Sequence, residues 1–356
     1  MNTQHAELNK LGWSDWFEQR AECKPPDSIA RVAAVDRGQL LLIDQAGQFR
    51  AKLSGSYLHS HPEPHERPCV GDWVCVEKKS GDSFAIIHSL LERRTSLRRK
   101  ASGIDVEYQI IGANLDYALI VQSCHFDFNV KRLERYLVMV MEGGAEPHIL
   151  LTKTDLVEPS TLAAQLAEIQ AAGITAPILP LSNVTGDGLD DLKRLLLPGK
   201  TYGFVGSSGI GKTTLINQLI GHEYLQTGDI SATGEGRHTT VRRELIRLDT
   251  GALVVDNPGM REFGIIDAEA GIEASYSDIS ELSSRCRFRD CKHTGESGCA
   301  VLAAVHSGAI SQQHLENFLK LREESSFNNM SYTEKRRKDK NFGRYIKSAK
   351  KDLKGN

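Results

Sequence analysis

The sequence predicts a multidomain α/β protein in which a small β-barrel is followed by a mostly parallel sheet with helices on both faces, and then by a helical module. Three observations lead to this prediction. Short alternating apolar runs fill residues 28–97, strand and helix patterns alternate over 98–265, and a helical, cysteine-bearing pattern occupies 266–333. At 356 residues the chain is too long for one ordinary core, so several domains are expected.

The composition is typical of a globular protein, with 40% hydrophobic and 25% charged residues. The net charge of -2 means that any nucleic-acid binding must come from local basic patches. No signal-peptide pattern and no run of about 18 apolar residues is present, so we expect a cytoplasmic protein with no membrane partner. Disulfides are rare in that compartment, and all seven cysteines are therefore predicted to be thiols or metal ligands.

Residues 1–27 form a short amphipathic extension, and residues 28–97 carry about five short strands separated by Gly, Asp and Pro. That number of strands in that length indicates an OB-type barrel. Cys69 and Cys75 lie among strand valines and are predicted to be small core residues. The proline-broken segment around His59, His61 and His65 is expected to be a solvated loop of the barrel.

Strand-like runs such as YALIV (117–121), HILL (148–151) and YGFV (202–205) alternate with helical segments after residue 98. This alternation predicts βαβ units and a mostly parallel sheet. Residues 334–356 form a tail rich in Lys and Arg.

Residues 206–213, GSSGIGKT, match the phosphate-loop pattern G-x-x-x-x-G-K-[ST] between a strand and a helix. Glycines let backbone N–H groups surround phosphates, and the helix N-terminus adds its positive end. Lys212 is expected to reach the β- and γ-phosphates in catalysis, and Thr213 to ligate Mg²⁺. The predicted phosphate-binding residues are Gly206, Ser207, Ser208, Gly209, Ile210, Gly211, Lys212, Thr213 and Thr214.

Two further motifs follow strand runs. Asp256-Asn257-Pro258-Gly259 places a carboxylate where it can bind Mg²⁺ and a glycine N–H where it can meet the γ-phosphate. Thr152-Lys153-Thr154-Asp155 places Asp155 where it can accept hydrogen bonds from guanine N1–H and the exocyclic amine, a donor pair that adenine lacks. Each motif alone is weak, but three at strand ends predict a site for GTP and GDP.

The order of these motifs resembles that of the circularly permuted GTPases. The base-reading segment 152–155 and the following Ser182 and Asn183 precede the phosphate loop, and the DNPG segment comes after it. The resemblance implies that Ser182 and Asn183 join residues 152–155 in binding GTP. It also places GRHTT (236–240) in the mobile switch, where either Thr239 or Thr240 would sense Mg²⁺.

Two positions depart from related patterns. The permuted GTPases usually have Asn where this chain has Thr152, a position that orients the loop. Ras-like enzymes place a water-orienting Gln where this chain has Met260, and a thioether cannot orient water, so slow intrinsic hydrolysis is expected. His238 is a candidate for the catalytic role, with a solvent-facing loop histidine as the alternative.

Cys286, Cys291, His293 and Cys299 lie within fourteen residues. Three thiolates and an imidazole on short turns suit one tetrahedral Zn²⁺, and a closed set of four ligands indicates a structural site.

The barrel, the permuted GTPase domain and the C-x₄-C-x-H-x₅-C module together resemble the RsgA family of ribosome small-subunit-dependent GTPases, from Leu11 to the tail. The resemblance implies a monomeric late assembly factor that binds the 30S subunit and 16S rRNA and hydrolyses GTP with ribosome stimulation. The basic segment Arg93, Arg94, Arg98, Arg99 and Lys100 and the 334–356 tail are candidate RNA contacts.

Two other functions stay open at this point. A nucleotide-switched rRNA-binding scaffold with negligible hydrolysis is consistent with Met260. A permuted GTPase of the large subunit shares the motif order, although the barrel and the cysteine module argue against it.

Overall fold

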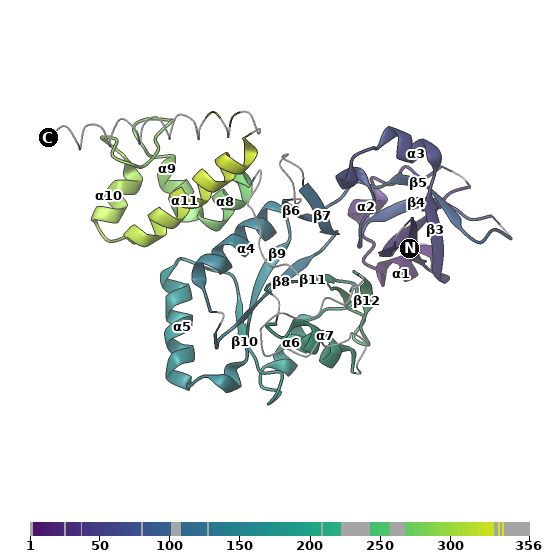
Figure 1. Cartoon of the computed structure of the whole chain (residues 1–356), viewed down its shortest axis with the longest axis horizontal. Coiled ribbons are helices and arrows are strands. Elements are labelled where there is room, and N and C mark those ends of the chain that lie inside the picture. Colours follow the sequence, from purple (N-terminus) through teal and green to yellow (C-terminus); the bar gives the residue numbers. More distant parts are fainter. Residues whose placement is uncertain are drawn as a thin grey trace.

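The computed structural model describes residues 3–24, 26–36, 38–79, 81–100, 108–126, 128–207, 209–221, 243–256 and 268–330, together with 334 and 337. Figure 1 shows three parts in a row: a barrel, a central sheet with its helices, and a helical module near the C-terminus. Within the described residues, every helix is too short or too polar to cross a bilayer.

The N-terminal part is a closed five-stranded barrel with strand order β1-β2-β3-β5-β4, which confirms the predicted barrel. Alternate residues of each strand point inward, and the inward set includes the buried Val32, Leu42, Val74 and Ile87. The strands are β1 (Ser28–Asp36), β2 (Gln39–Asp44), β3 (Gly47–Leu53), β4 (Trp73–Glu77) and β5 (Ala85–Leu90).

The segment between β3 and β4 is more ordered than the predicted solvated loop. Residues Gly55–Ser60 form helix α3, and Pro64–Glu66 form the 3₁₀ helix η1. Ser54 caps α3 by accepting a hydrogen bond from the Tyr57 N–H at 3.2 Å, and the buried Tyr57 hydroxyl donates to the Glu66 carbonyl at 2.7 Å. These two bonds explain why a proline-broken stretch still folds.

The N-terminal extension packs on the barrel through aromatic rings. Helices α1 (Thr3–Asn9) and α2 (Asp15–Glu18) flank Trp13, whose ring meets that of Trp73 on β4 edge-on at 4.8 Å. The same contact brings Cys23 to Cys75, with Cα atoms 5.4 Å apart, and the two form a disulfide. The prediction that these two cysteines are thiols, and that Cys75 is simply a core residue, is therefore wrong. The 52-residue separation hid a pairing that only the folded-back extension creates.

The central sheet has six strands in the order β10-β9-β8-β11-β13-β12, all parallel except β12. The predicted mostly parallel sheet is confirmed. A separate antiparallel pair, β6 with β7, precedes it. The strands are β6 (Ser96–Lys100), β7 (Tyr108–Ala113), β8 (Tyr117–Ser123), β9 (Glu146–Thr152), β10 (Ile178–Pro180), β11 (Thr201–Val205), β12 (Leu245–Arg247) and β13 (Leu253–Val255).

Two apolar cores cover the two faces of this sheet. One contains buried residues of α4 (Val130–Glu142) and α5 (Pro159–Ala171), and the other contains those of α6 (Leu189–Leu195) and α7 (Lys212–Ile220). The short 3₁₀ helix η2 (Thr154–Leu156) follows β9. Helices on both faces leave only the strand ends open, and this positions the site described below.

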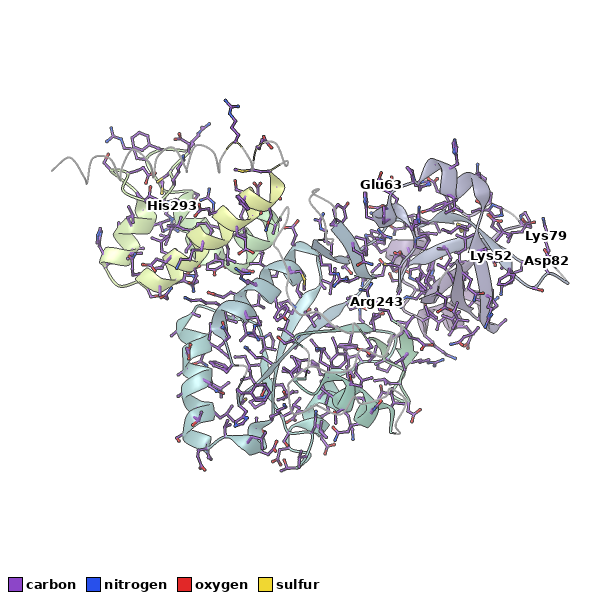
Figure 2. All side chains as sticks on the ribbon, in the orientation of Figure 1. Lys52, Glu63, Lys79, Asp82, Arg243 and His293 are labelled. Atoms are coloured by element: carbon purple, nitrogen blue, oxygen red, sulfur yellow. A yellow bond between two sulfur atoms is a disulfide. The ribbon has the colours of Figure 1, made fainter. Side chains whose placement is uncertain are left out.

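A buried arginine joins the barrel to the sheet. Arg31 on β1 is 1% exposed, and its guanidinium donates to the carbonyls of Gly71 and Asn114, both at 3.1 Å, and to the Thr201 hydroxyl at 2.9 Å. It also donates to the Leu11 carbonyl of the extension. Burial lowers the pKa of Arg31 to about 10, so it stays charged at neutral pH. Figure 2 places Arg243 in the same region between barrel and sheet.

The basic segment predicted to face RNA is largely used inside the protein. Arg93 binds Asp72 at 2.8 Å, Arg94 binds Asp116 at 2.6 Å, and Arg98 binds Glu142 at 3.1 Å. Each partner carboxylate is at most 13% exposed, so these pairs are part of the internal packing, and Arg94–Asp116 joins the barrel to the domain of the central sheet. The charge count of the segment therefore overstates what it can offer to RNA.

The C-terminal module consists of α8 (Glu269–Ser275), α9 (Ser277–Ser283), α10 (Ala300–His306) and α11 (Gln312–Asn329). It packs on α4 around the buried carboxylate of Glu134, which accepts hydrogen bonds from the Tyr276 hydroxyl at 2.9 Å and the Asn317 amide at 3.0 Å. Arg135 and Glu142 of α4 also bind the module, through Glu324 and the Gly271 N–H. These polar contacts lie next to the core that contains Ile272 and Phe318.

Candidate functional site

The phosphate loop connects the end of β11 to the start of α7, as the sequence predicts. Gly206, Gly209 and Gly211 all have positive φ, between 79° and 146°, where residues other than glycine are strained. A Cβ on Gly206 would lie 2.3 Å from the Val121 carbonyl of β8, whereas one on Gly209 would meet nothing within 4 Å. The loop is therefore packed against the sheet on one side and open on the other, where phosphates would lie.

Lys212 is already turned into the loop. The residue is 7% exposed, and its ammonium donates to the Gly206 carbonyl at 2.6 Å and to the Ser207 carbonyl. An ammonium carries three N–H donors. The geometry suits a lysine that braces the loop and also meets a phosphate, which is the predicted role.

Asp256 follows β13, the strand next to β11, and is 2% exposed. Burial raises the pKa of Asp256 to about 6, and the Lys212 ammonium partly offsets that rise. A buried carboxylate beside the phosphate loop is suited to bind a cation such as Mg²⁺, because the cation would stabilise its charged form. Thr213, the other predicted Mg²⁺ ligand, is in the first turn of α7.

The base-reading segment reaches the phosphate loop from β9. The buried Thr152 hydroxyl donates to the Ile210 carbonyl at 2.8 Å, and the Lys153 ammonium donates to the Gly209 carbonyl at 3.1 Å. Lys153 adopts a left-handed backbone conformation with φ of 61°. Thr152 thus fixes the loop, which agrees with the orienting role expected where related proteins have Asn.

Asp155 lies at the exposed end of this segment, in η2. The Ser182 hydroxyl donates to its Oδ1 at 2.5 Å, and the Asn183 amide donates to the Gly211 carbonyl at 3.1 Å. Ser182 and Asn183 follow the adjacent strand β10, so three loops distant in sequence lie at one edge of the sheet. Binding of guanine by Asp155 stays a prediction.

Several predicted residues lie outside the described part of the chain. They are Ser208 of the phosphate loop, His238, Thr239 and Thr240 of the switch, Gly259 of the DNPG segment, Met260, and all of the tail except residues 334 and 337.

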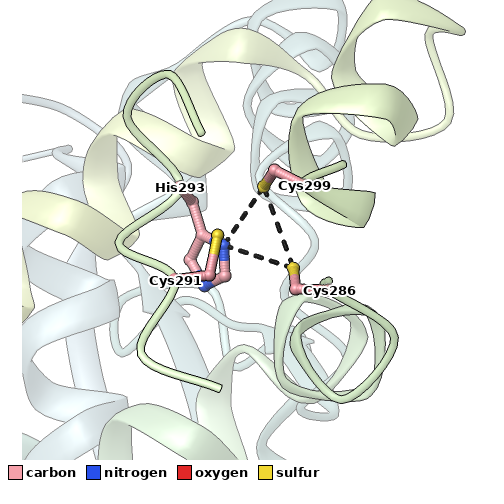
Figure 3. Close-up of side chains that lie close together, drawn as sticks. All are labelled: Cys286, Cys291, His293 and Cys299. Atoms are coloured by element: carbon pink, nitrogen blue, oxygen red, sulfur yellow. Dashed lines mark hydrogen bonds between the residues drawn. The ribbon is translucent and has the colours of Figure 1, made fainter. Parts of the chain in front are cut away.

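The second site is the cysteine cluster between α9 and α10. The donor atoms of Cys286, Cys291, His293 and Cys299 lie within 4.8 Å of one another, and Figure 3 shows the four side chains pointing toward one centre. The Cys286 and Cys299 sulfurs are 3.8 Å apart, and the Nδ1 of His293 lies 3.7 Å and 3.3 Å from them. An ion bound tetrahedrally to sulfur at about 2.3 Å would separate its sulfur ligands by roughly 3.8 Å. The cluster therefore fits a tetrahedral metal ion.

Ser283 fixes the tautomer of His293. The Ser283 hydroxyl donates to the Ile279 carbonyl at 2.8 Å, so it must accept the bond from Nε2 of His293 at 3.0 Å. The ring proton is then on Nε2, and the lone pair of Nδ1 faces the sulfurs, as metal binding requires. Burial lowers the pKa of His293, which also favours the neutral ring.

Glu296 organises the turn that holds these ligands. Its carboxylate accepts backbone N–H bonds from Lys292 and Thr294, both at 2.9 Å, and from Gly295 at 3.1 Å. These bonds lower the pKa of Glu296 to about 2. Sequence reasoning missed both Ser283 and Glu296. Only the acidic residue inside the ligand spacing, in H-T-G-E-S-G, gave a signal.

The fold and the loops at its edge define a P-loop GTP-binding protein whose base-reading strand precedes its phosphate loop. The RsgA GTPase family model matches residues 90–266. The chain is 42% identical to the small ribosomal subunit biogenesis GTPase RsgA 2 of Listeria monocytogenes over 321 residues, which is 90% of each chain. It therefore belongs to the RsgA GTPase family, a family of GTP-hydrolysing enzymes.

Two solved structures share the fold. The crystal structure of YjeQ from Thermotoga maritima aligns with a TM-score of 0.64 and 25% identity, covering 84% of this chain and 98% of YjeQ. YloQ, described as a circularly permuted GTPase, aligns with a TM-score of 0.61 and 25% identity, covering 86% of this chain and 97% of YloQ. The rotated motif order of this chain is consistent with that description.

Proposed function

We propose that this protein hydrolyses GTP to GDP and phosphate while bound to the small ribosomal subunit, during late maturation of that particle. The observation that carries the proposal is the similarity along nearly the whole chain to a small ribosomal subunit biogenesis GTPase. The arrangement of the phosphate and base-reading loops at one sheet edge supports GTP as the nucleotide. The activity of that relative, a GTPase of small ribosomal subunit biogenesis, favours hydrolysis and the small subunit over the scaffold and large-subunit alternatives.

Two metals belong to the proposal. One structural Zn²⁺ would be held by Cys286, Cys291, His293 and Cys299, because three thiolates with one imidazole are typical of closed zinc sites. Mg²⁺ would accompany GTP, with Thr213 and Asp256 as ligands and one of the two switch threonines completing the set. Mg²⁺ would neutralise charge on the phosphates, while Lys212 holds the loop and meets them. His238 is proposed to orient the attacking water.

The partner surface would include the barrel and the tail. OB-type barrels commonly bind oligonucleotides, and the 334–356 tail is rich in Lys and Arg, so both are proposed contacts with 16S rRNA. The pairing of Arg93, Arg94 and Arg98 with buried acids moves the expected RNA contacts away from that segment. We also propose a cytoplasmic monomer whose parts are divided at residues 27, 97, 265 and 333.

The test is steady-state GTP hydrolysis by the unmodified protein alone, with purified small subunits and with purified large subunits. We expect slow turnover alone and stimulation of about 10² or more by small subunits only, by analogy with GTPases whose water-positioning groups are supplied on partner binding. Equal stimulation by both subunits, or none, would contradict the proposal.

A further inference from the structure

We infer that Arg132, in the first turn of α4, is a positioning residue for the γ-phosphate end of the nucleotide. Its guanidinium donates to the Ser207 hydroxyl of the phosphate loop at 3.1 Å, across 75 residues of sequence. None of the nucleotide motifs includes Arg132. The inference rests on the proposed function, since it assigns a further residue to the same site.

The fold delivers Arg132 to this place through the start of α4. Asn129 caps the helix by accepting from the Arg132 N–H at 3.1 Å, and the buried Gln122 at the end of β8 donates to the Asn129 carbonyl at 3.1 Å. Strand β8 is the direct neighbour of β11, which leads into the phosphate loop. The helix start is thus fixed to the strand beside the loop.

The position of Arg132 is unfavourable for the helix alone. The first turn of α4 holds Lys131 and Arg132 and no acidic residue, although the N-terminal end of a helix is the positive end of its dipole. A cation there costs the helix a few tenths of a kcal/mol or more. Residues that break a local rule while contacting a functional loop are often kept for function.

Ser207 links Arg132 to the catalytic lysine. Arg132 binds the Ser207 side chain, and Lys212 binds the Ser207 backbone carbonyl, so two cations meet on one residue. Such cations repel one another, and an anion bound between the loop and Lys212 relieves that repulsion. Because Lys212 reaches the β- and γ-phosphates, a shift of Ser207 should disturb GTP more than GDP.

The experiment compares Arg132→Gln with Lys131→Gln, a neighbouring and exposed cation lost from the same helix turn. We expect Arg132→Gln to weaken a non-hydrolysable GTP analogue about tenfold and GDP less than about threefold, which is the scale of one charged hydrogen bond. Lys131→Gln should change both by less than about twofold. Arg132→Lys should restore part of the lost affinity, and Ser207→Ala combined with Arg132→Gln should be no worse than Arg132→Gln alone.

Equal weakening of GDP and the GTP analogue by Arg132→Gln would overturn the inference, because it would indicate a general loosening of the fold. So would equal behaviour of Arg132→Gln and Lys131→Gln. Thermal denaturation of each variant separates unfolding from a local effect. If the unmodified protein does not prefer GTP over ATP, the proposed function itself fails, and that result is independent of Arg132.

Discussion

The nucleotide site and the cysteine site are assembled in opposite ways. The nucleotide site gathers residues 152–155, 182–183, 206–213 and 256 from four strand ends, so it exists only when the whole sheet is formed. The cysteine site uses fourteen consecutive residues, held by local turns and by the N–H bonds to Glu296. The first should respond to changes throughout the sheet, and the second mainly to changes in its own loop.

Helix α4 contacts the phosphate loop at its first turn and the C-terminal module, which carries the cysteine site, farther along. Arg132 in its first turn reaches the phosphate loop, whereas Glu134, Arg135 and Glu142 bind the C-terminal module. The contrast can therefore be tested by changing a residue of the nucleotide site, a residue of the cysteine site, or a residue of α4.

Lys212→Ala is expected to give the largest difference between the two sites, because it should abolish function at the nucleotide site and leave the cysteine site intact. Loss of the ammonium that braces Gly206 and Ser207, and that is proposed to meet the phosphates, should lower GTP turnover by about 10³ or more. Zinc content and the protease resistance of residues 268–330 should stay unchanged. Turnover assays with metal analysis on the same preparation measure both. A variant that also loses its metal would show that the two sites are not independent.

The reciprocal change is Cys291→Ser. Removing one thiolate from a four-ligand site should reduce bound zinc to less than about one tenth of an ion per chain after dialysis, because affinity depends on the full ligand set. Protease resistance of the module should fall, whereas the Kd for GDP should change less than about twofold. Cys69→Ser, at a free cysteine in the barrel, is the matched control. Full zinc retention by Cys291→Ser would contradict the site.

The same contrast explains what could be predicted from the sequence. The phosphate loop, the base-reading segment and the four metal donors are short local patterns with fixed spacing, and the structure places them at the predicted strand ends and turns. The Cys23–Cys75 disulfide, the Arg31 junction and the Arg132–Ser207 bond join residues 52, 170 and 75 positions apart. No spacing rule connects such residues, because their proximity follows from the packing of complete elements.

The internal pairing of the basic segment was also hidden for a physical reason. The sequence predicts a positively charged surface at Arg93, Arg94 and Arg98. Their acidic partners come from other segments of the chain, so the sequence alone does not show the pairing. A cluster of basic residues predicts a nucleic-acid-binding face only when no acidic side chain of the same protein folds against it.

The smallest expected effect is at Glu134. Burial raises the pKa of this carboxyl above its usual value of 4.5, against the bonds from Tyr276 and Asn317. A raised pKa means that the folded protein binds the proton more tightly, so this contribution favours folding below pH 4.5 and is lost as the pH rises through the raised value. Glu134→Gln should remove that pH dependence and change stability by about 1 kcal/mol or less at neutral pH.

Denaturant unfolding of Glu134→Gln and the unmodified protein at several pH values above 4.5 provides the measurement. Glu324→Gln, which removes the partly exposed partner of Arg135 on the same interface, is the control. Parallel pH profiles for Glu134→Gln and the unmodified protein would mean that Glu134 does not titrate between these conditions.

The central claim is that a rotated sequence order rebuilds one guanine-selective site around Asp155, and nucleotide competition on the unmodified and Asp155→Asn proteins tests it most directly. The Ser182 hydroxyl donates a hydrogen bond to the Asp155 carboxylate and so holds it in place. We expect GTP to exceed ATP in affinity by about 10³–10⁴, because mismatched polar groups discriminate on that scale. Asp155→Asn should weaken GTP and improve xanthosine triphosphate. Equal competition by ATP and GTP on the unmodified protein would contradict the account.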